Sequence, residues 1–144
     1  MELNDIKQSF RLYMNGVTAA SMREKGLNYK LIWGISIQHL QEMAAEIIET
    51  TPAVEDQHKL ALQLWQEDIR ECKILATLVM PHELMSKETA EEWLTSLTTQ
   101  EMAEWLSFNL LRYMPYAREI AANAIQSDNK YQVICGQNIL KRIG

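Results

Sequence analysis

The sequence predicts an all-α fold, and two observations support this prediction. Valine is rare beside Leu, Ala, Met, Glu and Gln, and no stretch alternates apolar and polar residues for long enough to indicate a strand. The 144 residues are 47% apolar and 23% charged, with only 5 Gly and 3 Pro. This composition is typical of a globular domain with a buried core and excludes a disordered or fibrous chain.

The first 50 residues are expected to form N-terminal capping helices. Gly16, Gly26 and Gly34 interrupt what would otherwise be longer helices, and Ser36 is a candidate N-cap. The expected helices lie near Asp5 to Asn15, Thr18 to Lys25 and Ser36 to Glu49.

Residues 51–144 are expected to form three helix hairpins. Thr51-Pro52 offers an N-cap followed by proline at the first helical position, where the missing N–H is harmless. Thr98 with Glu101 fits a capping box, and Ser86 and Ser127-Asp128 are further candidate starts. The paired ranges are Pro52 to Trp65 with Asp68 to Met80, Lys87 to Leu97 with Thr99 to Leu111, and Pro115 to Ile125 with Asn129 to Arg142.

The short connections within each pair force neighbouring helices to run antiparallel. Apolar stripes on two of these helices need cover from a following hairpin; the stripes are Ile69, Cys72, Ala76 and Val79, and Met102, Trp105, Leu106 and Leu110. We therefore expect one helical-repeat domain over residues 1–144, a HEAT-like or armadillo-type α-α superhelix with a concave binding surface. The hairpin starts are less regular than the roughly 40 to 47 residues of HEAT repeats, so a compact helical bundle is the alternative.

Charge and segment composition restrict the function classes. The formal net charge of −5 is unusual for a nucleic-acid-binding domain, although a local basic face is compatible with it. The longest stretches without a charged residue run 11 residues, too short for a membrane span, and Met1 to Asp5 has no secretory pattern. Cys72 and Cys135 lie in apolar helical patterns typical of buried thiols. We expect a cytoplasmic protein without a membrane partner.

Metal and cofactor chemistry has no support in the sequence. His39, His58 and His82 are isolated, and no His or Cys pair has metal-ligand spacing. No phosphate-binding glycine loop, nucleophile elbow or dinucleotide fingerprint is present. We therefore expect neither a metal nor an organic cofactor.

Aromatic residues beside cations are the candidate ligand contacts. Most of the four tryptophans are expected in the core, but Arg70 and Lys73 near Trp65, and Arg112 with Tyr113, pair a cation with a ring. Arg70 and its neighbour Glu71 either form solvated ion pairs, or Arg70 points into the groove as an anion contact.

Several short motifs resemble a known family. They are Ser21-Met22-Arg23 to Gly26-Leu27, Tyr29-Lys30, Trp33-Gly34-Ile35, and Leu64-Trp65 with Asp68-Ile69-Arg70-Glu71. Together they are similar to the DNA alkylation repair family of HEAT-like helical proteins. The resemblance implies a cofactor-free DNA glycosylase that holds duplex DNA on a concave basic surface and removes N3- or N7-alkylated purines. A carboxylate and aromatic rings would face the deoxyribose of the lesion, without base flipping.

The sequence departs from the family where the resemblance places the essential aspartate. Ser107 occupies that position, while Met102 and Ala103 stand where the family has tryptophans. Glu104 is the candidate substitute, because it lies three residues before Ser107 on a neighbouring part of the helix face; alternatively, it simply faces water. A carboxylate there would stabilise the positive charge of the breaking glycosidic bond.

Three functional hypotheses follow. In the first, the protein binds duplex DNA through Arg70, Lys73, Trp105, Arg112, Lys141 and Arg142, with Glu104 as the catalytic candidate. In the second, it is a non-catalytic scaffold that holds a protein partner. In the third, it self-associates through the C-terminal helix, whose apolar residues include Val133, Ile134 and Ile139.

Overall fold

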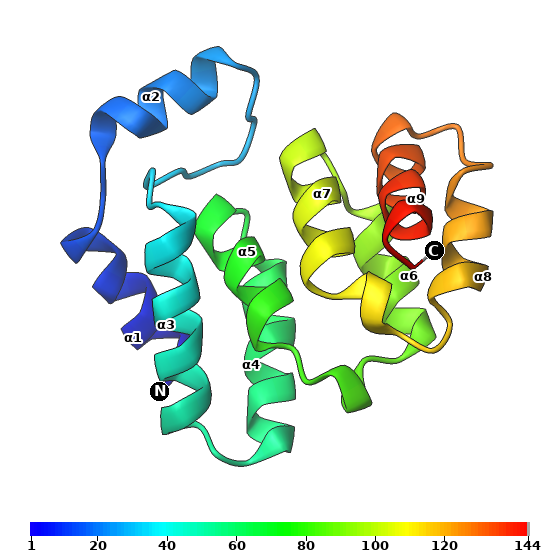
Figure 1. Ribbon diagram of the computed structural model, residues 1–144. Coiled ribbons are helices and arrows are strands. Elements are labelled where there is room, and N and C mark those ends of the chain that lie inside the picture. The colour runs from blue at the N-terminus through cyan, green and yellow to red at the C-terminus, as the bar shows by residue number, and fades with distance from the viewer. Residues whose placement is uncertain (144) are drawn as a thin grey trace. The chain divides into compact units, whose positions relative to one another are not determined.

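The computed structural model describes residues 1–143 and is all-α, as predicted. Residues 1–143 contain no β-strand, and an isolated bridge joins Leu31 and Ile69. The α-helices are α1 (Leu3–Ser9), α2 (Gly16–Glu24), α3 (Ile37–Thr50), α4 (Val54–Gln66), α5 (Arg70–Val79), α6 (Lys87–Thr95), α7 (Gln100–Asn109), α8 (Ala117–Ala124) and α9 (Lys130–Ile143), with short 3-10 helices η1 (Phe10–Leu12), η2 (His82–Leu84) and η3 (Leu111–Tyr113) (Figure 1).

The chain divides into two compact units. The first unit is Met1–Pro81, and the second begins at His82. The break therefore falls between the first and the second expected hairpin. The stacking of the hairpins into a superhelix stays a prediction.

Helix α5 forms the centre of the first unit. It packs against both α3 and α4, and α1 covers part of α4 (Figure 1). The predicted stripe on this helix is buried, since Cys72, Ala76 and Val79 have almost no exposed surface. Removing these apolar side chains from water is the main term that holds the three helices together.

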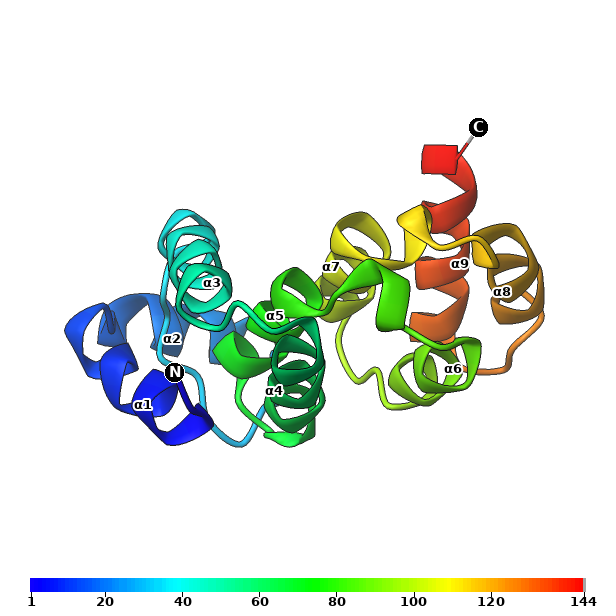
Figure 2. The same cartoon turned by 90° about the horizontal axis from the view of Figure 1, so that it is seen from below.

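Helix α9 has the same central place in the second unit. It packs against α7, α8 and η3 (Figure 2). Gly136 allows the close approach of α8, because a Cβ there would lie 2.9 Å from the carbonyl oxygen of Ala121. The predicted stripe on α7 is buried at Met102, Leu106 and Leu110, while Trp105 is half-buried.

Two of the predicted caps are confirmed, and other helix boundaries are shifted. The hydroxyls of Ser36 and Ser86 accept hydrogen bonds from the backbone N–H groups of His39 and Thr89, as N-caps do. Helix α7 is capped by Thr99 rather than by Thr98, and the Thr99 hydroxyl accepts from Met102. Helix α4 begins at Val54 after Ala53, two residues later than predicted.

The first helix ends at Ser9 rather than at Asn15, and Gly16 begins α2 instead of interrupting a helix. At the start of α9, the side chain of Asn129 rather than that of Ser127 or Asp128 accepts from the N–H of Tyr131.

No helix in the described part of the chain combines the length and apolar character that a membrane span requires.

Candidate nucleic-acid interface

The carboxylate of Glu71 holds a loop in the first unit. It is fully buried at the start of α5 and accepts hydrogen bonds from the backbone N–H groups of Trp33, Gly34 and Ile35 at 3.0, 3.0 and 3.3 Å. Buried charge requires such compensation, because an unpaired carboxylate loses its hydration without replacement. The two sequence motifs Trp33-Gly34-Ile35 and Arg70-Glu71 therefore form one contact.

The guanidinium of Arg70 completes this contact. Its Nη1 lies 2.8 Å from Oε2 of Glu71 and donates to the carbonyl oxygen of Ile35 at 3.1 Å. The side chain is only 2% exposed. Both alternatives drawn from the sequence, a solvated pair and a groove contact, therefore need correction. Arg70 is part of a buried ion pair and presents no free cation to nucleic acid.

Lys73 is also engaged with the first unit. Its ammonium group donates to the carbonyl oxygen of Trp65 at 2.7 Å and lies 4.6 Å from the centroid of the Trp65 ring. Burial lowers the pKa of Lys73, because a partly desolvated ammonium loses hydration. The Trp65 ring itself is in the core, as expected of most tryptophans, and gives no platform for a base.

In the second unit, Arg112 lies between two aromatic rings. Its guanidinium carbon is 4.5 Å from the ring centroid of Phe108 and 4.4 Å from that of Tyr113. Its Nε donates to the carbonyl oxygen of Phe108 at 2.7 Å, and Nη2 donates to the Tyr113 hydroxyl. The side chain is thus fixed while remaining half-buried at the surface.

Arg142, near the end of α9, approaches the same phenyl ring. Its guanidinium carbon lies 4.7 Å from the centroid of Phe108, so this one ring contacts two arginines. Two guanidinium groups that share one ring repel each other, and an anion beside them would relieve that repulsion. Arg142 is exposed.

Further aromatic side chains extend this surface. Trp105 meets Phe108 edge to face, and His82 of η2 stacks on Tyr113 with ring centroids 5.2 Å apart. Phe108 is 37% and Tyr113 is 53% exposed, which is unusual for large rings in a packed helical unit. We call this set the arginine–aromatic cluster; it consists of His82, Trp105, Phe108, Arg112, Tyr113 and Arg142.

Glu104 lies next to the cluster, and Ser107 does not. Glu104 is exposed on α7, one helical turn before Phe108, and accepts a hydrogen bond from Nε2 of Gln100 at 3.0 Å. Ser107 is fully buried, and its hydroxyl donates to the carbonyl oxygen of Glu104 at 2.9 Å. Of these two side chains, only that of Glu104 is accessible to a ligand.

The sequence-predicted cations therefore separate. Arg112 and Arg142 join Trp105 in one cluster, Arg70 and Lys73 belong to the first unit, and Lys141 is exposed beside Arg142. Sequence reasoning missed Phe108, although its position four residues before Arg112 places both on one helical face. It also missed His82, which reaches Tyr113 through the fold and gives no local signal in the sequence.

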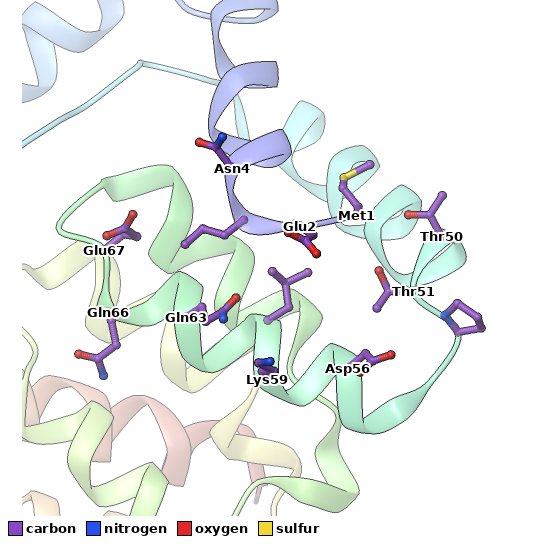
Figure 3. A pocket seen from close by; sticks show the side chains of 13 residues that line it. Met1, Glu2, Asn4, Thr50, Thr51, Asp56, Lys59, Gln63, Gln66 and Glu67 are labelled. Carbon is purple, nitrogen blue, oxygen red and sulfur yellow. The ribbon is translucent and has the colours of Figure 1, made fainter.

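One pocket of the first unit lies away from every predicted site residue. Its volume is about 860 Å³, and it is bounded by the start of α1, the end of α3 and the exposed side of α4 (Figure 3). The hydroxyl of Thr51 at its edge is buried and has no hydrogen-bond partner among the described residues. No group of His, Cys, Asp or Glu among residues 1–143 has an arrangement that could hold a metal ion.

The fold and the cluster define an all-α protein that presents fixed arginines and exposed aromatic rings on one unit. A family model describing DNA alkylation repair enzymes matches residues 6–135 of the 144. The chain belongs to this family, as its motifs suggested. Searches of curated proteins and of solved structures returned no match.

Proposed function

We propose that this protein binds duplex DNA through the arginine–aromatic cluster of its second unit. The observation that carries the proposal is the Phe108 ring, which contacts the guanidinium groups of both Arg112 and Arg142 at the surface. Arginine side chains suit backbone phosphates, and exposed rings suit sugars or bases. Membership of the DNA alkylation repair family supports the same ligand.

The acidic net charge does not oppose this proposal. Binding depends on the local field at the contact surface, and a guanidinium group beside a low-dielectric aromatic face is poorly screened. The cluster contains no carboxylate, and Glu104 is the acid nearest to it along α7.

We further propose that the reaction served by this binding is the excision of N3- or N7-alkylated purines. An alkylated purine carries a positive charge, so it leaves as a neutral base when the glycosidic bond breaks and the deoxyribose gains oxocarbenium character. The Glu104 carboxylate, one turn from Phe108, would stabilise that charge electrostatically, and water would then add to the sugar. Ser107 carries no charge and is fully buried, so it has no part in this step.

Duplex binding measured against salt concentration tests the first part. We expect the affinity to fall steeply as salt rises, because each phosphate contact releases bound counterions. Affinity no better than millimolar at low salt, or affinity independent of salt, would contradict DNA binding. In that case the scaffold hypothesis, with a protein partner, becomes the better account.

Release of 7-methylguanine from methylated duplex tests the second part. We expect release by the wild type and a loss of about 100-fold or more for Glu104→Gln, which keeps the side-chain size but removes the charge. Glu101→Gln is the matched control, because Glu101 is a second acid on α7. Equal release by the wild type and Glu104→Gln would exclude Glu104 from catalysis.

A further inference from the structure

The segment from η1 to the loop after α2 exposes large apolar side chains. Leu12 is 79%, Met14 is 59% and Val17 is 84% exposed, and α2 contains no buried residue at all. In Figure 1, α2 lies beyond the ends of α3 and α5 rather than alongside them. We call residues 10–30 the N-terminal arm.

The arm is held firmly despite this exposure. Phe10, the first residue of the arm, is fully buried, and the N–H of Asn15 donates to the carbonyl oxygen of Trp33 at 2.9 Å. The backbone at Gly34 lies so close that a Cβ there would be 2.3 Å from the carbonyl oxygen of Asn15. The exposed side chains therefore project from a fixed turn. Because several of them are close together in the sequence, they are a candidate contact surface.

The charge of the arm indicates an anionic ligand. Residues 10–30 contain four basic residues and one acidic residue, whereas the whole chain contains 14 basic and 19 acidic residues. Arg11 precedes the apolar turn, and Lys25 and Lys30 follow α2. Arg23 has a structural part, because it donates to the carbonyl oxygens of Tyr29 and Lys30.

The exposed apolar residues lie at the N-terminal end of α2 rather than in a stripe along it. Leu12, Met14 and Val17 lie at the turn and in the first helical turn, and Thr18 to Ser21 that follow are small. A membrane-surface helix needs an apolar face along its whole length, and α2 does not have one. Exposed apolar side chains in a basic segment are typical of proteins that insert side chains into the DNA minor groove and part a base step.

We propose that the N-terminal arm is a second DNA contact, in which Leu12 and Met14 wedge into the minor groove while Arg11, Lys25 and Lys30 meet the flanking phosphates. This inference rests on the proposed function. In this proposal, the first unit unstacks and kinks the duplex locally, a role that the arginine–aromatic cluster does not have.

The test uses a duplex of about 20 base pairs with fluorophores at its ends and a flexible TA step at its centre, so that kinking changes energy transfer between the ends. We expect the wild type to kink the duplex by about 20–90°. The double variant Leu12→Ser, Met14→Ser should lose the kink and about 10-fold in affinity, since two aliphatic side chains stay in water. Its salt dependence should be unchanged because no cation is removed.

Two further variants define the contact. Ile48→Ser removes an exposed apolar side chain of the same unit outside the arm and should keep both kink and affinity. Lys25→Gln with Lys30→Gln should keep the kink and lower the slope of log affinity against log salt by about 1 to 2.

The results that overturn the proposal are distinct. If the double variant Leu12→Ser, Met14→Ser kinks DNA like the wild type, Leu12 and Met14 do not act as a wedge. Binding of the wild type to phosphatidylserine vesicles, lost in this variant while DNA binding is unchanged, would assign the arm to a membrane surface. A dimer lost in this variant would assign it to a second copy. If the wild type binds no duplex, the proposed function fails as well.

Discussion

Arg70 in the first unit and Arg112 in the second occupy opposite environments. Arg70 follows the buried Ile69, and Arg112 follows the buried Leu111. Arg70 is buried and pairs with Glu71, whereas Arg112 is held at the surface by Phe108 and Tyr113. The first fixes a loop, and the second stays available to a ligand.

The difference shows how to tell a structural arginine from a ligand-binding one. A guanidinium that satisfies a buried carboxylate is lost to ligand binding, because removing it would leave a charge without a partner. A guanidinium held by rings, one carbonyl and one hydroxyl keeps further donors for a ligand, because it has five N–H groups. An arginine that pairs with a buried carboxylate therefore has a structural role, and an arginine without such a partner is available to bind a ligand.

Loss of the buried carboxylate is expected to have the largest effect. Glu71→Ala leaves Arg70 buried without a counter-charge and frees three backbone N–H groups, so the free energy of unfolding should fall by about 3–5 kcal/mol. Urea denaturation monitored by circular dichroism measures this fall.

The conservative variant provides the graded control. Glu71→Gln keeps one acceptor oxygen but loses the charge, so its loss should be smaller than that of Glu71→Ala. A fall below about 1 kcal/mol for Glu71→Ala would contradict the buried pair as a structural contact.

The second largest loss of stability is expected at Gly34, whose N–H donates to the Glu71 carboxylate. Gly34 has a φ of 77° and a backbone oxygen 2.3 Å from the Cβ position, whereas Gly26 has a φ of 97° and open space around it. Gly26→Ala should cost about 1–2 kcal/mol through its φ alone, and Gly34→Ala about 1–3 kcal/mol more through the clash. Thermal unfolding of the two variants, compared side by side, makes the measurement; equal losses would contradict the close packing at Gly34.

The exposed ring at the centre of the cluster should affect binding rather than folding. Phe108→Ala should weaken duplex binding by about 1–3 kcal/mol, because it removes both a stacking face and the support of two arginines. Its unfolding free energy should change less than that of Glu71→Ala, since the ring is partly in water. Fluorescence anisotropy with labelled duplex measures binding, and wild-type affinity for the variant would exclude the ring from the contact.

The smallest expected effect comes from a partly exposed ion pair of the first unit. The hydrogen bond from Lys7 to Glu67, at 2.6 Å, raises the pKa of Lys7 above its ordinary value of 10.5, and burial opposes this rise. The pair should contribute about 0.2–1 kcal/mol, because solvent screens it.

The sign of its pH dependence follows from the raised pKa. The contribution is complete below the unfolded pKa and is lost as the pH rises through the folded pKa. Lys7→Met should therefore be less stable than the wild type at pH 7 and equal to it well above pH 10.5. A stability difference independent of pH would contradict the electrostatic origin.

The sequence was sufficient for the fold class and for most helix positions. Apolar spacing and hydroxyl caps act within a few residues, so Ser36 and Ser86 could be recognised without the structure. The position of the α7 cap was ambiguous, because Thr98 and Thr99 are adjacent and both can accept from the first turn.

The candidate site was only partly predictable. Arg112 and Tyr113 are neighbours in the chain, so their pairing had a local signal, whereas Arg142 and His82 reach the cluster through helix packing. Arg70 was misassigned because its burial depends on Trp33, Gly34 and Ile35, which lie more than 30 residues away. Contacts at such separation leave no periodic pattern.

The central claim is that the arginine–aromatic cluster binds duplex DNA. The most direct test measures the slope of log affinity against log salt for the double variant Arg112→Gln, Arg142→Gln. The matched control is Arg118→Gln with Lys130→Gln, which removes the same charge from the second unit outside the cluster. We expect the cluster variant to lower the slope by about 2 and the control to leave it near the wild-type value. Equal slopes for both variants would contradict the cluster as the DNA contact.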